Sequence, residues 1–429
     1  MNRLMKNSDL GYLGMVPSDW PIEKLKGFFC VSSVKNRPEA TVLSLYRDYG
    51  IVPKDSRSDN HNVTSSDTSN YKFVEVGDFV INKMKGWQGS MALSKYEGIV
   101  SPAYHVFKFK NGRLLPRYAH YLLRNKSYAD EWHKLSTGLR VGQWDLHVDD
   151  FLKTMIPVPP LDEQQRIANY LDDKCGQIDC AIQAAEDSIE EYKTYRARLI
   201  HEAVFHGINN GYGTKDYKWV SHVREQFRNV RLKDYANFSR GNQITKAELR
   251  DSGKAIINYG QIHSKLNSGV HLPQELIRFA PEDLVDDSTV LRRNDLLLAT
   301  TSEDRAALGT AMFIDSDEEL YPGGDSMVCR LHDVACPKYV AYQFLTDAWR
   351  NQLRIITNGI KVFHVTQKRI STVNMVLPPD NEQRQIVDYL DGKCMEIAKS
   401  ITVKQSIIDD LKKYKQSLVY EVVTGKKEV

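Results

Sequence analysis

Basic, amide and aromatic side chains gather in loop-like stretches of two segments, and their chemistry suits a nucleic acid. In the first segment these side chains are Lys83, Lys85, Trp87, Gln88, Arg140 and Gln143. In the second segment they are Arg240, Gln243, Tyr259, Gln261, Arg305, Lys361 and His364. Lysine and arginine neutralise phosphates, and arginine and glutamine also form hydrogen bonds with base edges. Any one of these residues, taken alone, is equally typical of an ordinary exposed loop, or of a core in the case of tryptophan.

Their recurrence at matching places favours the DNA interpretation. Lys85 and Gln88 lie in KGWQGS, whose glycines let the backbone approach DNA closely. GLRV, which contains Arg140, and GIKV, which contains Lys361, begin at glycines that match each other in the two segments. We predict that Lys85 and Lys361 contact phosphates and that Gln88 contacts a base edge.

Sequence signatures of catalysis are missing or incomplete. The chain has no G-x-x-x-x-G-K-[ST], G-x-G-x-x-G or H-E-x-x-H motif. SPAY at residues 101–104 lacks the leading Asn or Asp and the second proline of an amino-methyltransferase motif. EYK at residues 191–193 has a nuclease-like form but lies on a helical seam. We therefore predict a chain that is not an enzyme and holds no metal or cofactor of its own.

Composition favours a multidomain protein of the cytoplasm. A length of 429 residues with 41% hydrophobic residues allows two or more domains with separate cores. No apolar stretch has the length of a membrane helix, and the N-terminus does not resemble a signal peptide. The six cysteines show no C-x-x-C pair or zinc spacing, which favours a reducing compartment.

The net charge of +3 is unevenly distributed. Residues 161–206 hold 5 basic against 10 acidic residues, and residues 378–429 hold 9 against 9, so the rest of the chain carries +8. This excess is expected of a surface that meets a polyanion, although ordinary surface scatter also produces it.

Two copies of one motif, 219 residues apart, show which elements must position these loops. PPLDEQQRIANYLDDKCGQI begins at Pro159, and PPDNEQRQIVDYLDGKCMEI begins at Pro378. Weaker repetition precedes each copy, as where Tyr118 matches Tyr339. The chain is predicted to contain a first globule (1–158), a first spacer helix (159–206), a second globule (207–377) and a second spacer helix (378–429).

Each motif begins a long helix with an apolar seam. In the first helix the seam contains Leu171, Ile178, Ile182, Ile189 and Leu199, and in the second it contains Leu390, Ile397, Ile401, Ile408, Leu411 and Leu418. Heptad spacing of this kind is typical of a coiled coil, and Arg196 and Lys404 interrupt it. We predict an antiparallel pair, which a charged residue or glycine at Ile182 or Ile401 would loosen.

The globules mix short apolar runs typical of strands with helix-like stretches. The strand-like runs are residues 79–81, 104–109 and 295–298, and the helix-like stretches are 118–135 and 339–356. The predicted fold class is α+β: two mixed α/β globules, separated by two long helices that form an antiparallel coiled coil, in a pseudo-two-fold repeat.

The duplicated P-x-x-E-Q-x-x-I-x-x-Y-L-D pattern and the helices that follow it resemble the specificity subunit of type I restriction-modification systems. The opening KNSDLGYLGMVPSDWPIEKLK also resembles the start of such subunits, and TKDYKWVSHVREQFRNVRLK resembles a degenerate second copy. That copy lacks the counterparts of Pro17 and Trp20, and Phe227 stands in the tryptophan position. The departure affects the expected packing of the second globule.

The resemblance implies two target-recognition domains that read an asymmetric, split site on double-stranded DNA. It implies partnership with two methylation subunits, which carry S-adenosylmethionine and methylate adenine, and with translocase-nuclease subunits where restriction occurs. Three alternatives remain: a specificity subunit of a methylation-only system, a coiled-coil scaffold, and a methyltransferase or nuclease with a cryptic site.

Overall fold

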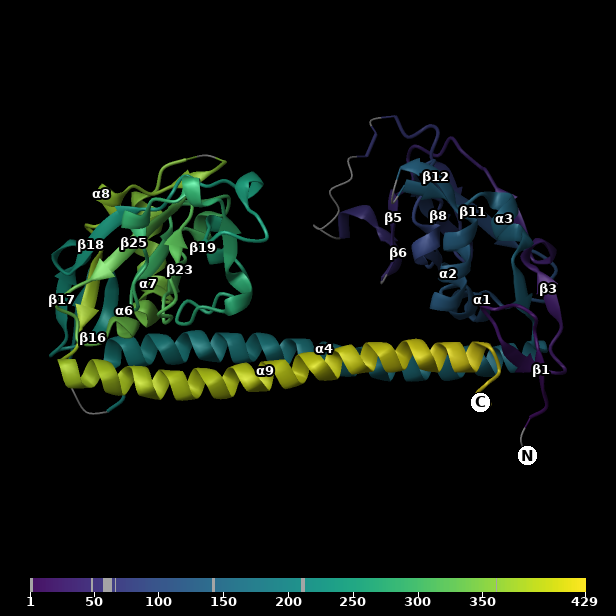
Figure 1. Cartoon of the computed structure of the whole chain (residues 1–429). Coiled ribbons are helices and arrows are strands. Elements are labelled where there is room, and N and C mark those ends of the chain that lie inside the picture. The colour runs from purple at the N-terminus through teal and green to yellow at the C-terminus, as the bar shows by residue number, and fades with distance from the viewer. Residues whose placement is uncertain are drawn as a thin grey trace. The chain divides into compact units, whose positions relative to one another are not determined.

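The computed structural model describes residues 3–47, 49–56, 64–65, 67–140, 143–209, 213–359 and 361–429, with the backbone alone for 137–140 and 143. The chain divides into two compact units, one formed by residues 1–186 with 405–429 and the other by residues 187–404. Each unit contains one globule and a part of both long helices (Figure 1). No helix in the described residues is apolar over enough of its length to cross a membrane.

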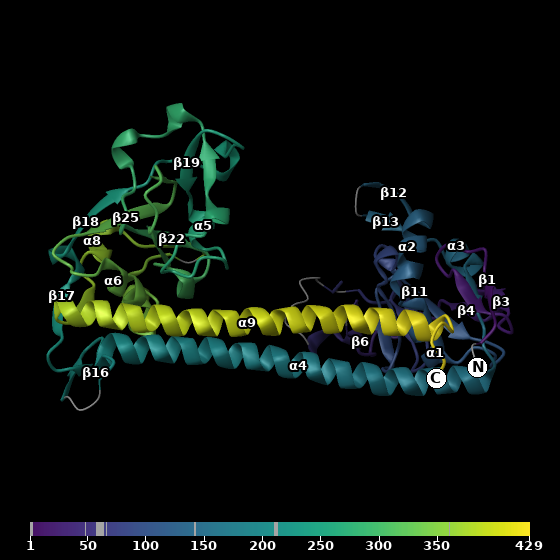
Figure 2. The same ribbon diagram turned by 60° about the horizontal axis from the view of Figure 1, so that its bottom comes forward.

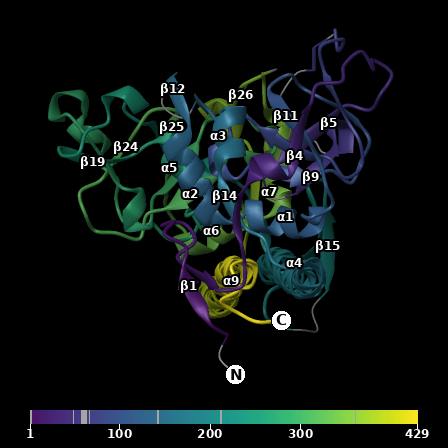
Figure 3. The same ribbon diagram turned by 90° about the vertical axis from the view of Figure 1, so that its right-hand side faces the viewer.

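The long helices are α4 (Leu161–His206) and α9 (Asp380–Val423). Within each unit their segments run side by side in opposite directions (Figures 1 and 2). In the first unit, for example, Lys415 Nζ lies 2.6 Å from Asp179 Oδ1, and Arg166 near the start of α4 approaches the carbonyl of Val429. Figure 3, which looks along the helices, shows the two coils next to each other.

Burial along both helices confirms the predicted seam. Leu171 and Leu390 are fully buried, and Ile178, Ile182, Ile189, Ile397, Ile408 and Leu418 are buried as well. Leu199, Ile401 and Leu411 are half-buried, as are the two polar interruptions, Arg196 and Lys404. The heptad pattern therefore identified the packed face of each helix, although its members are buried to different depths.

The first globule is built on the four-stranded antiparallel sheet β4-β11-β8-β9. Its strands are β1 (Met5–Asn7), β2 (Met15–Pro17), β3 (Ile22–Lys24), β4 (Phe29–Ser32), β5 (Leu43–Tyr46), β6 (Gly50–Pro53), β7 (Lys72–Val74), β8 (Phe79–Asn82), β9 (Met91–Leu93), β10 (Gly98–Val100), β11 (Tyr104–Phe109), β12 (Thr137–Arg140), β13 (Gln143–Asp145) and β14 (Met155–Pro157). Its helices are α1 (Pro116–Leu123), α2 (Lys126–Leu135) and α3 (Val148–Lys153). Phe29, Phe79 and Phe107 pack together between the sheet and α3.

The second globule has the corresponding sheet β18-β25-β21-β23, together with a smaller sheet β20-β19-β24. Its strands are β15 (Thr214–Tyr217), β16 (Val220–Arg224), β17 (Arg228–Arg231), β18 (Ala236–Arg240), β19 (Lys254–Ile257), β20 (Arg278–Ala280), β21 (Leu296–Ala299), β22 (Thr301–Ser302), β23 (Ala311–Phe313), β24 (Tyr321–Pro322), β25 (Ser326–Leu331), β26 (Phe363–His364) and β27 (Asn374–Leu377). Its helices are α5 (Tyr259–Ile262), α6 (Pro337–Phe344), α7 (Asp347–Ile356) and α8 (Gln367–Ile370).

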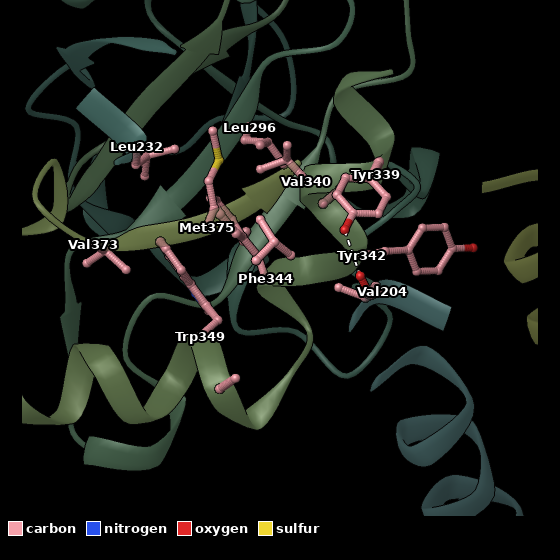
Figure 4. Close-up of a cluster of buried hydrophobic side chains, with 14 of the residues drawn as sticks. Val204, Leu232, Leu296, Tyr339, Val340, Tyr342, Phe344, Trp349, Val373 and Met375 are labelled. Atoms are coloured by element: carbon pink, nitrogen blue, oxygen red, sulfur yellow. Dashed lines mark hydrogen bonds between the residues drawn. The ribbon is translucent and has the colours of Figure 1, made fainter. Parts of the chain in front are cut away.

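The core of the second globule joins its sheet, its helices and α4 (Figure 4). Phe344 stacks on Trp349 with ring centroids 3.8 Å apart, and both side chains are buried. Leu296 from β21 and Val204 from α4 belong to the same cluster. Because the two main sheets share one strand order, the internal repeat extends from the helices to the globules. The predicted fold class is thus confirmed.

Two details of the sequence prediction were wrong. The helix-like stretches 118–135 and 339–356 are each two helices, with breaks before α2 and α7. The side chains of Asn125 and Thr346 accept hydrogen bonds from the backbone N–H groups of Ser127 and Trp349, and such caps begin a new helix. Asp295 lies outside β21, where its carboxylate binds Arg330.

Two histidines of the first unit, His105 and His120, are expected to make it less stable in acid. Burial and then Lys72 and Lys83 lower the pKa of His105 to about 4, and burial and then Arg124 lower the pKa of His120 to about 3. In the unfolded chain these histidines bind protons near pH 6.5. The stability that their neutral imidazoles contribute is therefore present above pH 6.5 and is lost as the pH falls toward their pKa values in the folded protein.

When the pH falls from 7 to 5, we expect each histidine to lower the free energy of unfolding by about 1 kcal/mol, after allowance for solvent screening. Urea unfolding at both pH values measures this loss. His120→Gln should reduce the difference, and His332→Gln, which alters an exposed histidine of the other unit, should leave it unchanged. A pH dependence that is equal in His120→Gln and wild type would contradict the assignment.

Candidate nucleic-acid interface

The duplicated motif attaches each globule to the helices through equivalent hydrogen bonds. Gln164 Oε1 accepts from the backbone N–H of Leu115 at 2.7 Å, and its amide donates to the carbonyl of Pro159 at 2.8 Å. Gln383 repeats the arrangement with Cys336 at 3.1 Å and Pro378 at 3.0 Å. Both glutamines are buried, so their amides satisfy backbone groups that water cannot reach.

The aspartate of the motif holds the equivalent globule helix in each copy, α1 in the first and α6 in the second. Asp172 accepts from Tyr121 Oη at 2.6 Å and pairs with Arg117. Asp391 accepts from Tyr342 Oη at 2.5 Å, with Lys338 Nζ 2.8 Å from its other oxygen. One further tyrosine in each globule binds the end of a long helix. In the first globule Tyr118 Oη donates to Val423 O of α9 at 3.1 Å, and in the second Tyr339 Oη donates to Val204 O of α4 at 2.8 Å.

The glutamate of the motif anchors the segment that enters each globule. Glu163 accepts from Trp20 Nε1 at 3.0 Å and pairs with Arg3. In the second copy Glu382 pairs with Arg224 and accepts from Gln226 Nε2 at 2.8 Å. Phe227 is fully buried where the first copy has tryptophan. In the degenerate copy Phe227 therefore takes the packing role of the tryptophan, and Arg224 and Gln226 supply the hydrogen bonds to the glutamate.

A glycine ends each long helix at this anchor. Gly207 has a φ of +77°, and a Cβ on it would lie 2.7 Å from Glu382 Oε1. Gly425 has a φ of +70°, and a Cβ on it would lie 2.3 Å from Pro17 Cγ. Both positions need the left-handed backbone and the small size of glycine. Each globule is consequently attached to the two long helices by the same set of motif contacts and a terminal glycine, and we call this attachment site a platform.

The predicted DNA-contacting residues of the first globule lie around a short turn, residues Gly86–Gln88, that packs on α2. Trp87 contacts Trp144 and His133, with ring centroids 5.1 Å apart in both cases, and Lys83 Nζ lies 3.5 Å from Asp145. Lys85 and Gln88 are exposed. The side chains of Arg140 and Gln143 lie outside the described residues. The structure thus brings Lys83, Trp87 and β13 together.

In the second globule the equivalent turn, Arg305–Ala307, packs on α7 beside the β22–β26 pair. Arg305 donates to the carbonyl of Arg354 at 2.6 Å and lies over the ring of Phe363. His364 is exposed and pairs with Thr301 across the two strands.

Other predicted residues reach the same region through α5. His263 Nε2 lies 3.2 Å from Thr301 O, and its ring contacts Tyr259. Asn258 Nδ2 donates to Ile244 O at 3.0 Å, which places the loop containing Gln243 next to α5. The side chain of Gln261 is already used within α5, since its Oε1 accepts a hydrogen bond from the backbone N–H of Asn258 at the start of that helix.

Arg240 and Lys361 are exposed, and no described contact joins either side chain to this group. Sequence reasoning missed His133, His263 and Phe363. Trp87, Thr301 and Arg305, which they respectively contact, are distant in sequence, so no local pattern indicated them. In the described residues no group of three or more His, Cys, Asp or Glu side chains is placed to hold a metal ion.

The chain thus contains two globules with the same strand order in their main sheets and with dissimilar loops, and comparison with known proteins identifies its family. Residues 17–184 and 224–405 match the type I restriction modification DNA specificity domain, and the chain belongs to that family.

Two curated relatives illustrate the range of similarity. The type I restriction enzyme MjaVIII specificity subunit of Methanocaldococcus jannaschii is 22% identical, over 96% of this chain and 93% of its own length. The type I restriction enzyme EcoKI specificity subunit of Escherichia coli is 22% identical over 34% of this chain and 32% of its own length.

A solved chain described as "Structural basis underlying complex assembly and conformational transition of the type I R-M system" has the same fold. It aligns with a TM-score of 0.68 and 17% identity, over 95% of this chain and 98% of its own length.

Proposed function

We propose that this chain is the non-catalytic DNA-recognition subunit of a type I restriction-modification complex. Residues 1–158 and 207–377 are the two target-recognition domains, residues 159–206 and 378–429 form the helical spacer, and double-stranded DNA with a bipartite, asymmetric site is the ligand. Two methylation subunits that carry S-adenosylmethionine methylate adenine at this site in the cytoplasm, and translocase-nuclease subunits join them for restriction. The observation that supports the proposal is the pair of equivalent platforms carrying unlike loops.

Methylation mapping of a genome exposed to the assembled complex tests this proposal. We expect a motif with two unlike halves, and replacement of residues 1–158 by the equivalent segment of another specificity subunit should change one half only. A continuous or perfectly palindromic motif would contradict the assignment of two recognition domains. A complex that assembles but shows no sequence preference would instead favour a structural scaffold.

The exposed Gln88 is the proposed base-reading residue of the first domain. Its replacement by alanine should weaken binding to the target by about 1–3 kcal/mol and relax one position of the motif, because a base edge loses its hydrogen-bond partner. Lys85→Ala, three residues away, and Lys361→Ala should instead weaken binding to all sequences, with a shallower salt dependence. Titration of target and scrambled duplexes distinguishes the two effects, and an unchanged motif in Gln88→Ala would exclude base reading.

A further inference from the structure

Three lysines of the first globule lie around the start of β11, at one end of the main sheet. Lys72 on β7 is half-buried, and its Nζ donates to Tyr104 O, at the start of β11, at 2.6 Å. Lys83 follows β8, and its backbone N–H binds Ala103 O, immediately before β11. Lys35 is exposed on a segment that runs beside β7, where Phe73 N–H donates to Val34 O at 2.8 Å.

The positive charge of this cluster is poorly compensated. Within the described residues Asp145 is the one carboxylate at ion-pair distance from any of the three lysines, 3.5 Å from Lys83. Burial and then the charges of Lys35 and Lys83 lower the pKa of Lys72, as expected for an ammonium group that lacks an acidic partner.

A paired lysine on the same sheet shows the contrast. Lys108, toward the other end of β11, lies 2.8 Å from Glu75 and 3.3 Å from Asp78. These carboxylates raise the pKa of Lys108, led by the hydrogen bond to Glu75. The globule therefore neutralises a cation at one end of the strand and leaves three near one another at the other end. Holding like charges together is unfavourable unless an anion joins them.

We infer that Lys35, Lys72 and Lys83 form a binding site for backbone phosphates of duplex DNA. The assignment rests on the proposed function and deepens it, because it separates a phosphate-holding edge from the exposed base-reading turn at Gln88. Lys83 lies next to both the phosphate-holding edge and the turn. Its partner Asp145 follows Trp144, and Trp144 packs on Trp87 of the turn. Phosphates held by the three ammonium groups would set the register of the duplex against the turn without reading its sequence.

The test measures the salt dependence of binding by the assembled complex, with the full chain, to a mixed-sequence duplex and to the mapped target. Lys35→Gln, Lys83→Gln and Lys72→Met each remove one charge, and Lys110→Gln is the matched control, an exposed lysine just beyond the opposite end of β11. Each cluster variant should flatten the slope of log Kobs against log[salt] by about 0.9 on both duplexes, while the preference for the target is retained. Lys110→Gln should behave as wild type.

Lys35 is exposed, so its replacement tests the site even if Lys72→Met fails to fold. Wild-type slopes in both Lys35→Gln and Lys83→Gln would overturn the phosphate site, whatever the specificity of the complex. Flattened slopes in the lysine variants, together with a wild-type complex that does not distinguish target from mixed sequence, would support the phosphate site and reject the proposed function. The two assignments can therefore fail separately.

Discussion

Replacement of Glu382 by alanine is expected to lower the unfolding free energy of the second unit by about 3–5 kcal/mol, because it removes the carboxylate that pairs with the buried Arg224 guanidinium. The side chains of Arg224 and Glu382 are 4% and 10% exposed, so water cannot replace the lost carboxylate. Gln226 would lose its acceptor as well. Urea unfolding, followed by hydrogen exchange in residues 214–231, measures the loss.

Glu396→Ala is the matched control on the same helix, since Glu396 forms an exposed pair with Lys393 and should cost no more than about 0.5 kcal/mol. The double variant Arg224→Met with Glu382→Leu should recover most of the stability, because both buried charges are removed together. A loss in Glu382→Ala as small as that in Glu396→Ala would show that the pair does not hold the entry segment.

Replacement of Leu390 by alanine should destabilise the second unit by about 2–5 kcal/mol, through lost burial and the cavity that remains. Leu390 is fully buried where α9 meets the core of the globule, and its counterpart Leu171 is equally buried in the first unit. Ile401→Ala on the same seam should cost less, about 1 kcal/mol, because Ile401 is half-buried.

Thermal or urea unfolding of both variants provides the comparison, and assembly with the proposed methylation subunits is a second readout. If the packed seam holds the helical pair in the form that binds these subunits, Leu390→Ala should weaken assembly more than Ile401→Ala does. Equal destabilisation by Leu390→Ala and Ile401→Ala would mean that burial depth along the seam does not determine its contribution.

The long helices and their packed face could be predicted from the sequence, because helical periodicity and the 219-residue repeat are properties of the chain itself. The strands at 79–81 and 104–109 were also recognisable, since short apolar runs between polar turns carry a local signal. The breaks at Asn125 and Thr346 were not, because a capping side chain interrupts a helix without disturbing its apolar pattern.

The arrangement of the candidate interface was decided by tertiary structure. The sequence alone predicted that basic and amide residues recur in two globules, each followed by a copy of the duplicated motif. Only folding places Trp144 and His133 against Trp87, and only folding gives Lys108 two carboxylates while leaving Lys72 beside Lys35 and Lys83. These neighbours come from strands and loops far apart in the chain. Sheet pairing, which depends on the whole core, therefore decides which lysines are neutralised within the globule and which are left to attract an anion.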